Sequence, residues 1–476
     1  MSELSPLPFT EKIQANPATS RLLVLSNGHG EDAIAIRILQ ELQQQPLFPE
    51  IFALPLVGVG RAYQKLNIPM IGSVRSMPSG GFIYMDGRQL AGDVRSGLLQ
   101  LTLNQFKAVR RWVKTQKKSG YSVKILAVGD IVPLLFAWLS GCEYAFVGTA
   151  KSEYYLRDET GWLKRDTQAA RWEGWSGSVY LPWERWLMSR RRCKAVFPRD
   201  SLTTKILKQW KIPAFDLGNP MMDGLNPSFP LQKFYSTDTR RQEIERPLVI
   251  TLLPGSRTPE AYANWEKITI AVSALIAMFR EPDFVGHTNG NVLFLAGIAP
   301  GLDCNILAET IKNQGWSAIP NQQSPIQIPD HQALTFKQKN AYIIFTQSNY
   351  NDCLHLGDFA IAMAGTATEQ FVGLGKPAMI IPGEGPQFTP AFAEAQSRLL
   401  GCSVILVEKP GDVASEFKSL FANPDRLYAI AKNGEQRMGK PGAAQRIAQC
   451  FSELVPPELG VNLTVGWVRQ EDRFKF

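Results

Sequence analysis

Residues 358–382 read DFAIAMAGTATEQFVGLGKPAMIIP. Within them, Phe359–Met363 is an apolar run of strand length, Ala364–Thr366 is a turn of small residues, and Ala367–Leu374 can form a helix that Gly375 closes. A strand followed by a glycine-bearing turn and a helix N-terminus gathers backbone N–H groups and a positive dipole end at one point. The stretch therefore predicts either an anion site, most usefully for a phosphate, or an ordinary α/β crossover.

Strands and helices alternate on both sides of this stretch. Pro247–Leu253 is a strand that ends in the loop 254–257, and a helix follows it to about Phe279. An earlier series starts with the strand Arg21–Leu25, the glycine-rich turn 26–32 and a helix. Two such blocks predict an α/β protein built from two Rossmann-like, doubly wound domains that face a cleft.

The length and composition suit a globular protein of two or three domains. The chain has 476 residues, of which 45% are hydrophobic and 20% charged, and no uninterrupted apolar run is long enough to span a bilayer. The N-terminal sequence lacks the basic and apolar segments of a secretory signal. A net charge of +8 is compatible with nucleic acid, an anionic membrane surface or a diphosphate ligand as the acidic partner.

Cysteine and histidine spacing argues against a disulfide framework or a metal site. The six cysteines include no C-x-x-C pair and follow no regular spacing, which indicates reduced thiols in the cytosol. The four histidines also lack the spacing of zinc ligands. We therefore expect no metal.

Acidic and imidazole side chains crowd the turn after the first strand. The G-x-G-x-x-G fingerprint is absent there, so a dinucleotide site is weakly supported, and His29, Glu31 and Asp32 stand in its place. We expect Asp32 to cap the following helix, whereas for His29 and Glu31 both a catalytic and a capping role remain open.

Asp130 follows the buried strand Val123–Val128, at the edge where open α/β sheets place their ligands. Because Pro133 already defines the next helix start, we expect Asp130 to serve chemistry rather than to cap.

A loop with exposed-looking apolar residues, including Phe82 and Ile83, leads into a helix from about Val94 to Lys117 that ends in a basic sequence. Apolar residues beside a basic helix are typical of a surface that rests on anionic lipid. An amphipathic helix packed on the sheet, with a solvated basic face, is the alternative.

Tryptophan is concentrated in the segment 161–186, which holds five of the eleven and includes Trp183 and Trp186. Three consecutive arginines, Arg190–Arg192, follow directly. This clustering predicts either an insertion that contacts a membrane interface or an acceptor, or a loop packed on itself.

Three motifs occur in a characteristic order: VFPRDSLTTKILKQWKIPAFDLGNPMMDG at 196–224, LLPGSR at 252–257 and AGTATEQFVGLGKP at 364–377. In these motifs, together with Gly129-Asp130, the chain resembles lipid-A-disaccharide synthases, and in particular the cyanobacterial group of lipid-A-disaccharide synthase-related proteins. It is similar more loosely to the peptidoglycan N-acetylglucosaminyltransferase and other two-domain glycosyltransferases of the GT-B fold.

The resemblance implies a UDP-sugar donor held by the second domain and a lipid acceptor that approaches the first. Ser256 and Arg257 then occupy the donor-diphosphate position beside Gly255, and an arginine fork suits phosphate. Gly365 and Thr366 match a second phosphate-contacting turn. Further donor-binding candidates are Thr368, Glu369, Gln370 and, in the loop after Pro382, Gln387.

The chain departs from the family in two places. The family's ribose-binding Glu aligns with Gln370, so a charge-assisted bond is lost unless the adjacent Glu369 replaces it. The first loop also differs: in the alignment with the peptidoglycan enzyme, its catalytic-loop His falls on Glu31, and His29 lies two residues earlier. Asp130 matches the family's acidic residue at the end of a first-domain strand.

The expected organisation follows from these motifs and from the composition. It comprises a loose N-terminal leader over 1–20, an acceptor domain over 21–225 with a Trp-rich insertion at about 157–186, a linker over 226–246, a nucleotide-sugar domain over 247–440, and a C-terminal helix and tail over 441–476 that can cross back to the first domain.

The expected function is that of a UDP-sugar-dependent hexosyltransferase in lipid biosynthesis, cytoplasmic and peripheral on the inner face of a membrane. Asp130 or Glu31 would be the general base, assisted by His29, and Arg257 would stabilise the departing diphosphate. Phe82, Ile83, Trp183 and Trp186 would meet the acceptor or the membrane. No cofactor besides the donor substrate is expected. A UDP-sugar 2-epimerase and a catalytically degenerate nucleotide- or lipid-binding module remain alternatives, and nucleic-acid binding rests on net charge alone, so we expect none.

Overall fold

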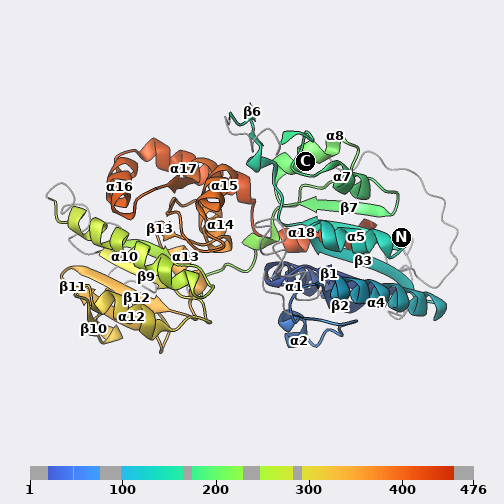
Figure 1. The fold of residues 1–476 in the computed structure, drawn as a ribbon, viewed down its shortest axis with the longest axis horizontal. Helices are drawn as coiled ribbons and strands as arrows, with labels where there is room; N and C mark the ends of the chain where they lie inside the picture. Colours follow the sequence, from blue (N-terminus) through green and yellow to red (C-terminus); the bar gives the residue numbers. More distant parts are fainter. Residues whose placement is uncertain are drawn as a thin grey trace, which may run out of the picture.

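The computed structural model describes residues 20–46, 48–75, 98–164, 174–228, 247–281 and 292–454. Two sheets, each covered by helices, lie side by side and form two Rossmann-like domains (Figure 1). The leader up to residue 19, the linker residues 229–246, and the membrane candidates Phe82 and Ile83 lie outside the described residues.

The first domain is built on a parallel sheet. Among the described residues its strand order is β2-β1-β3-β4-β7, and every neighbouring pair is parallel. The strands are β1 (Ser20–Ser26), β2 (Glu50–Pro55), β3 (Ser122–Gly129), β4 (Glu143–Gly148) and β7 (Cys193–Pro198). The strands are apolar almost throughout, as expected of parallel strands that are buried on both faces.

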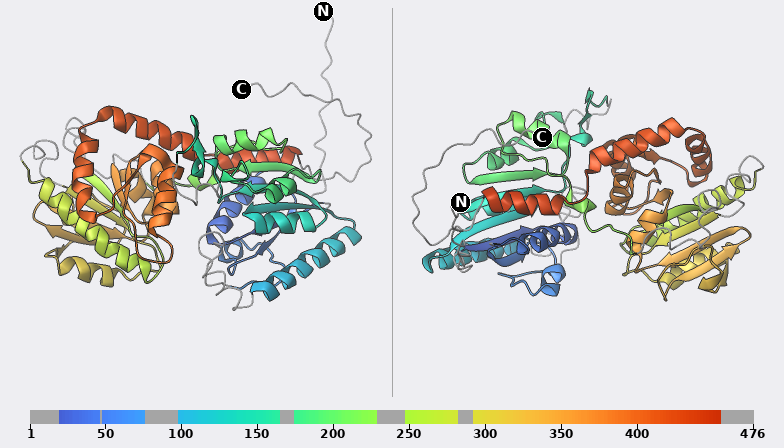
Figure 2. Two further views of the ribbon diagram at one scale, coloured as in Figure 1. Left: turned by 45° about the horizontal axis from the view of Figure 1, so that its top comes forward. Right: turned by 180° about the vertical axis from the view of Figure 1, so that it is seen from behind.

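Helices cover both faces of this sheet. One face packs against α4 (Leu98–Lys118), α5 (Ile131–Leu139) and α7 (Pro182–Met188). The other packs against α1 (His29–Gln43) and α18 (Ala443–Leu454), which comes from the far end of the chain. In Figure 2 the red α18 runs beside the dark-blue α1.

The short helices and hairpin strands of this domain are α2 (Arg61–Lys65), β5 (Arg157–Asp158), β6 (Gly161–Trp162) and α8 (Ser201–Gln209), with single 3-10 turns at Glu153–Tyr155 and Pro220–Met222.

The second domain is built on a longer, mixed sheet. Its order among the described residues is β10-β11-β12-β9-β8-β13-β14-β15, with antiparallel pairing only between β10, β11 and β12. The strands are β8 (Leu248–Leu253), β9 (Val292–Gly297), β10 (Ser317–Ile319), β11 (Leu334–Gln338), β12 (Ala341–Thr346), β13 (Phe359–Ala362), β14 (Ala378–Ile380) and β15 (Val404–Leu406). The helices are α10 (Glu260–Met278), α12 (Cys304–Lys312), α13 (Tyr350–Leu356), α14 (Thr366–Gly373), α15 (Pro390–Leu400), α16 (Val413–Phe421) and α17 (Pro424–Met438), with 3-10 turns at Asn321–Gln323, Gly401–Ser403 and Pro410–Asp412.

Alternate residues of the central strands enter separate cores. Ile250 and Leu252 of β8 pack with Trp265 of α10, whereas Val249 packs on the opposite face with Cys353 of α13. This alternation places helices on both faces of the sheet, which is the doubly wound arrangement predicted from the sequence.

The two domains are joined by packed contacts as well as by the chain. Tyr154 and Met222, from the first half of the sequence, belong to the hydrophobic core of the second domain. Asp223 accepts hydrogen bonds from the backbone N–H groups of Gly442, Ala443 and Ala444, and so fixes the start of α18 where the chain crosses back.

Several predicted elements differ from those in the structure. The segments Pro69–Ile71 and Ala214–Leu217 have the composition of strands, but each contributes only an isolated bridge, at Met70 and at Ala214. The helix expected to begin at Ala367 begins at Thr366, and the irregular tryptophan-rich segment contains the helix α7. None of the helices in the described part of the chain combines the length and the apolar character that a membrane span requires.

Candidate functional site

The loops that follow β8 and β13 lie next to each other. The two strands are hydrogen-bonded neighbours, with Leu253 opposite Ala362, and Met363 donates its backbone N–H to the carbonyl of Leu253 at 2.8 Å. Asn264 of α10 ties the loops together further: its Nδ2 donates to the carbonyls of Pro254 (3.1 Å) and Met363 (3.4 Å). The turn 254–257 and the turn 364–366, predicted to contact one diphosphate, therefore open at the same edge of the sheet.

Gly255 makes this close approach possible. Its φ of +97° lies in the left-handed region, and a Cβ at this position would stand 3.1 Å from the carbonyl oxygen of Met363. A side chain would therefore be strained by its backbone and crowded by the neighbouring loop. Ser256 is exposed and Arg257 is half-buried beside it. Burial lowers the pKa of Arg257 and nearby Glu260 opposes this shift, but a guanidinium remains charged at neutral pH.

A third loop, 383–389, reaches the same edge from β14. Oε1 of Glu260, at the start of α10, accepts from the backbone N–H of Phe388 at 2.6 Å and of Gln387 at 3.3 Å. Lys267 donates to the carbonyl of Pro382 and pairs with Glu384, each at 3.0 Å. The first helix of the domain thus holds this loop, and with it the partly exposed Gln387, beside the other two.

The N-terminus of α14 has no side-chain cap. Gly365 is its N-cap residue, and Thr366 lies exposed at its first position. Gln396 of α15 holds the turn from behind, because its Nε2 donates to the carbonyls of Ala364 and Gly365 at 3.2 and 3.1 Å. Thr368, another donor-binding candidate, is fully buried and donates its hydroxyl to the carbonyl of Ala364 at 2.6 Å. The uncapped backbone N–H groups of the first turn suit an anion.

The adjacent candidates Glu369 and Gln370 both contact the domain junction. Glu369 forms a buried ion pair with Arg199, which directly follows β7 of the first domain. Gln370 accepts from the hydroxyl of Tyr350 at 2.6 Å and donates to the carbonyl of Met221 at 2.9 Å.

Asp130 lies at the carboxyl end of β3 with both of its oxygens occupied. Oδ1 accepts from the backbone N–H of Val132 at 2.9 Å, and Oδ2 accepts from Nδ2 of Asn27 at 2.8 Å. Asp130 is therefore the N-cap of α5, and the prediction that the Pro133 helix start made such a cap unnecessary is wrong. Burial raises the pKa of Asp130 to about 6, although these two hydrogen bonds act to lower it.

Glu31 lies against Gly129, immediately before Asp130. A Cβ at Gly129 would stand 3.3 Å from Cγ of Glu31 and from Cβ of Asn27, so the glycine gives room for the two side chains to approach. Burial raises the pKa of Glu31 to about 7, and the carboxylates of Asp130 and Asp32 contribute to this rise. Two adjacent carboxyl groups with pKa values near neutrality can hold and pass a proton at physiological pH.

The remaining residues of the first loop take different positions. His29 is exposed at the first position of α1. Asp32 is buried and accepts from the hydroxyl of Ser26 at 2.5 Å, whereas the N-cap of α1 is Gly28 with no side-chain cap. The expectation that Asp32 caps this helix is therefore wrong: it stands at the fourth helical position, where its own N–H already bonds to the carbonyl of Gly28.

Thr149 and Arg199, which directly follow β4 and β7, link the carboxylates of the first domain to α14. Oγ1 of Thr149 lies 3.5 Å from Oε1 of Glu31, and the Thr149 carbonyl accepts from Nη1 of Arg199 at 3.2 Å. Nη2 of Arg199 donates to Glu369. Polar contacts thus run from the candidate general base to the candidate donor motif across the domain junction. Neither Thr149 nor Arg199 was predicted from the sequence to take part in the site. Arg199 could have been found from the sequence because, like Asp130, it directly follows a buried strand.

A buried ion pair lies close enough to Asp130 to affect its pKa. Lys151 and Glu184 form an ion pair of 2.5 Å in which both side chains are almost fully buried. The carboxylate of Glu184 raises the pKa of Asp130 and the ammonium of Lys151 lowers it by less, so the pair as a whole adds to the rise that burial causes.

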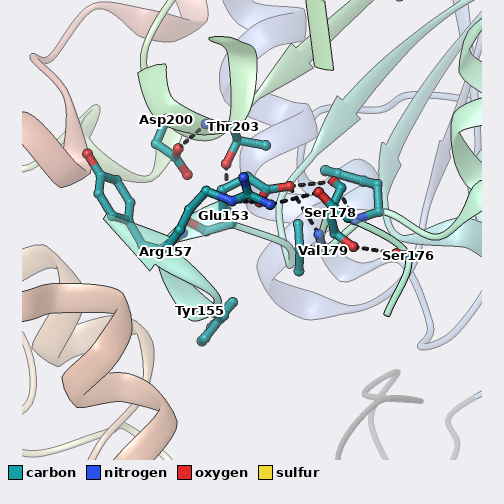
Figure 3. Close-up of polar contacts among 12 residues, drawn as sticks. Glu153, Tyr155, Arg157, Ser176, Ser178, Val179, Asp200 and Thr203 are labelled. Atoms are coloured by element: carbon teal, nitrogen blue, oxygen red, sulfur yellow. Dashed lines mark hydrogen bonds and ion pairs between the residues drawn. The ribbon is translucent and has the colours of Figure 1, made fainter. Parts of the chain in front are cut away.

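The tryptophan-rich insertion is anchored by Glu153. This fully buried carboxylate accepts from the hydroxyl of Ser178 and, at 3.0 Å, from the backbone N–H of Val179 (Figure 3). It also pairs with Arg157 at 2.9 Å, while its backbone N–H donates to Thr203 at 2.8 Å. The network fixes the segment 174–180 to the body of the first domain.

Exposed apolar side chains gather on the outer face of α5 and α7, which pack together. Trp183 and Trp186 are 53% and 45% exposed, and Leu135 and Leu139 are exposed on α5. The ring of Trp186 lies 5.2 Å from that of Trp138, and the guanidinium of Arg190 stacks over it at 4.3 Å. This surface combines aromatic and basic groups at one face of the first domain.

Within the described residues, no group of three or more His, Cys, Asp or Glu side chains is placed to hold a metal ion.

The sequence matches no protein-family model and no curated protein at a significant level. The structure is similar to a UDP-N-acetylglucosamine 2-epimerase, described as putative, from Listeria monocytogenes, with a TM-score of 0.51 and 11% identity over 94% of this chain and 100% of that one. It is also similar to MurG from Acinetobacter baumannii (TM-score 0.50, 15% identity, 91% and 99% covered) and to the calicheamicin glycosyltransferase CalG4 (0.51, 12%, 92% and 100%). The protein therefore has the GT-B fold, and at these identities the likeness extends to the fold alone.

Proposed function

We propose that the protein is a glycosyltransferase that moves a sugar from a UDP-sugar to a lipid acceptor at a membrane surface, in the manner of lipid-A-disaccharide synthases. The observation that carries the proposal is the adjacency of the turns 254–257 and 364–366. Arg257 and the uncapped first turn of α14 can grip a diphosphate together, and the same groups can stabilise it as it leaves. UDP-sugar enzymes among proteins of the same fold support this choice of ligand.

The acceptor would be activated in the first domain. Asp130 or Glu31 would remove the proton from an acceptor hydroxyl, since the pKa of each carboxyl group lies within about one unit of neutral pH. His29, exposed at the first position of α1 two residues before Glu31, would assist. The transfer then forms the glycosidic bond as the bond between sugar and diphosphate breaks.

Membrane attachment is the further part of the proposal. Trp183 and Trp186 lie on a face that also carries Arg190, and aromatic side chains with adjacent cations suit the interfacial region of an anionic leaflet. A protein that rests peripherally on this face would present its first domain to an acceptor held in the bilayer.

A second candidate function is that of a UDP-sugar 2-epimerase. The Glu31–Asp130 pair favours it as well, because epimerisation also needs a carboxyl group able to take and return a proton near neutral pH. Such an enzyme would need the nucleotide-sugar and no lipid.

Incubation with radiolabelled UDP-sugars, with and without a total lipid extract, separates the candidates. A transferase labels a lipid only when the extract is present, whereas an epimerase converts the UDP-sugar in its absence. Arg257→Ala should abolish either activity by weakening UDP binding, and Arg280→Ala, an exposed arginine at the opposite end of α10, is the matched control. UDP affinity that is unchanged in Arg257→Ala by calorimetry would rule out the diphosphate role.

A further inference from the structure

A short segment of the first domain, residues 153–162, contacts the last helices of the second domain. It consists of the 3-10 turn Glu153–Tyr155 and the hairpin formed by β5 and β6, and it belongs to neither of the two large sheets. The hairpin stands beside the end of α17 that is nearest the first domain (Figure 1 and Figure 2). The segment is therefore placed to hold the two domains together at a point outside both sheets.

The ring of Tyr154 is inserted into the second domain. Tyr154 is 1% exposed and packs in the core of that domain. The guanidinium of Arg437, in the last turn of α17, lies 4.1 Å from the centre of the ring. Arg437 is itself held in place, because its Nη1 donates to the carbonyls of Arg398 and Leu399 at 2.6 and 2.9 Å. Burial of the ring and its attraction to a fixed cation both favour this position.

Hydrogen bonds add to this attachment on both sides of the ring. The hydroxyl of Tyr154 donates to Oε1 of Glu159 at 2.5 Å, and the same oxygen accepts from Nε2 of Gln436 of α17 at 2.8 Å. The backbone carbonyl of Tyr155 accepts from the guanidinium of Arg398 of α15. The turn and the hairpin are thus bound to two different helices of the second domain.

The same segment is anchored firmly in the first domain. Arg157 pairs through Nε with Glu153 at 2.9 Å (Figure 3), donates from Nη2 to the carbonyl of Gly177 at 2.7 Å and stacks on the ring of Trp162 at 3.9 Å. The backbone N–H of Glu153 donates to Thr203 of α8 at 2.8 Å. These contacts make the turn and the hairpin one rigid piece that moves with the first domain.

The end of α17 that this piece contacts lies next to a chain crossing. The chain passes between the domains twice, after Asp223 and again at residues 439–442, and Asp223 accepts a hydrogen bond from Gly442. The second crossing begins two residues after Arg437 and is flanked by Gly439 and Gly442, with φ of +76° and +87°. Such loop positions absorb the backbone change when domains rotate. Rotation here would carry the end of α17 away from the turn that holds Tyr154.

We propose that residues 153–162 form an interdomain lock, in which Tyr154 holds the end of α17 against the first domain and so prevents rotation about the crossing at 439–442. The domains then keep one orientation in the free protein, and they can open only when Tyr154 leaves the core of the second domain. The lock goes beyond the proposed function and needs no donor or acceptor to act.

A test must measure the orientation of the domains and not only stability, because removing any buried tyrosine destabilises a protein. Electron–electron double resonance between one spin label on each domain reports the distribution of interdomain distances. Lys114 of α4 and Lys312 of α12 are exposed and suit the two labels. The labels are attached to non-canonical residues at these positions, so the native cysteines of the full-length protein stay unmodified.

The labelled protein without ligand should show a single narrow distance distribution. Tyr154→Ala should broaden this distribution and shift part of it to longer distances. Tyr154→Leu should do the same, because leucine neither stacks with Arg437 nor reaches Glu159 with a hydroxyl. Tyr144→Ala is the matched control: Tyr144 is 0% exposed and its hydroxyl donates to the carbonyl of Leu187 at 2.6 Å, but it lies within the core of the first domain. It should leave the distribution narrow.

Three results would overturn the lock. The first is a broad distribution in the protein without substitutions. The second is a distribution in Tyr154→Ala as narrow as that of the parent protein, and the third is equal broadening in Tyr154→Ala and Tyr144→Ala. If Tyr154→Ala does not fold, Tyr154→Leu decides in its place, since it keeps an apolar side chain in the core. None of these results bears on UDP binding, so the lock can fail while the proposed function stands.

Discussion

Asn27 donates a 2.8 Å hydrogen bond from Nδ2 to Oδ2 of Asp130, a residue 103 positions further along the chain. The bond joins the carboxyl ends of the neighbouring strands β1 and β3. It holds the oxygen of Asp130 that does not cap α5, so the orientation and the ionisation of the candidate base both depend on Asn27.

Asn27→Ala should shift the acidic limb of the pH dependence of kcat/KM to higher pH. Burial raises the pKa of Asp130 to about 6 and the Asn27 hydrogen bond opposes this rise, so losing the bond should raise the pKa by about one further unit. Less of the base is then ionised at a given pH below 7. Asn313→Ala, at an exposed asparagine after α12, is the control. If the acidic limb of the pH profile of Asn27→Ala does not shift, Glu31 and not Asp130 is the base.

Asp32→Asn should stabilise the protein at alkaline pH. Burial raises the pKa of Asp32 from 3.8 to about 6, so between these values the folded protein binds a proton that the unfolded chain releases. The stability that this proton contributes is present at acid pH and is lost as the pH rises through 6. An asparagine carries no charge and can accept the same hydrogen bond from Ser26, so the variant should gain about 1–3 kcal/mol at pH 8 and little at pH 4.5.

Urea unfolding at the two pH values measures this difference. Asp303→Asn, an exposed carboxylate that caps α12, is the control and should show no such pH-dependent gain. Destabilisation of Asp32→Asn at pH 8 would mean that the ionised carboxylate is needed in the folded state.

The sequence was sufficient to predict the arrangement of the donor loops. The apolar runs at 248–253 and 359–362 are of strand length and end in glycine-bearing turns, and parallel strands of one sheet open their carboxyl ends at one edge. The antiparallel strands β10 and β11 were not predicted, because strands of three and five residues leave too short a pattern.

The partners of individual side chains could not be predicted in the same way. Arg199 and Glu369 are separated by 170 residues and belong to different domains, and no local pattern encodes which domain edges meet. The two capping expectations failed for a local reason instead. Pro133 removes one N–H from the first turn of α5 but leaves that of Val132, which still needs an acceptor, and Asp32 lies too far into α1 to supply one.

Trp183→Ala should weaken binding to anionic vesicles. Trp183 is 53% exposed on α7, and inserting its ring into the interfacial region would contribute about 1.5–3 kcal/mol, so its loss should reduce the partition coefficient by roughly tenfold or more. Tyr428→Ala, at a 75% exposed aromatic residue of α17 in the second domain, is the control. Sedimentation with phosphatidylglycerol-containing vesicles measures both, and equal losses in the two variants would place the contact elsewhere.

Gly255→Ala should disrupt the donor site more than backbone strain alone predicts. Gly255 has a φ of +97° and its Cβ would stand 3.1 Å from the carbonyl oxygen of Met363, so a methyl group both strains the turn and pushes the loops after β8 and β13 apart. Gly120→Ala isolates the first effect, because Gly120 has a comparable φ of +82° but no atom within 4 Å of the added Cβ. Both variants should lose about 1–2 kcal/mol of stability to backbone strain, and only Gly255→Ala should lose UDP affinity. Thermal unfolding and calorimetry measure the two quantities separately. If Gly255→Ala binds UDP as tightly as Gly120→Ala does, the two turns do not act on one diphosphate, and the proposed donor site is wrong even though the loops are adjacent.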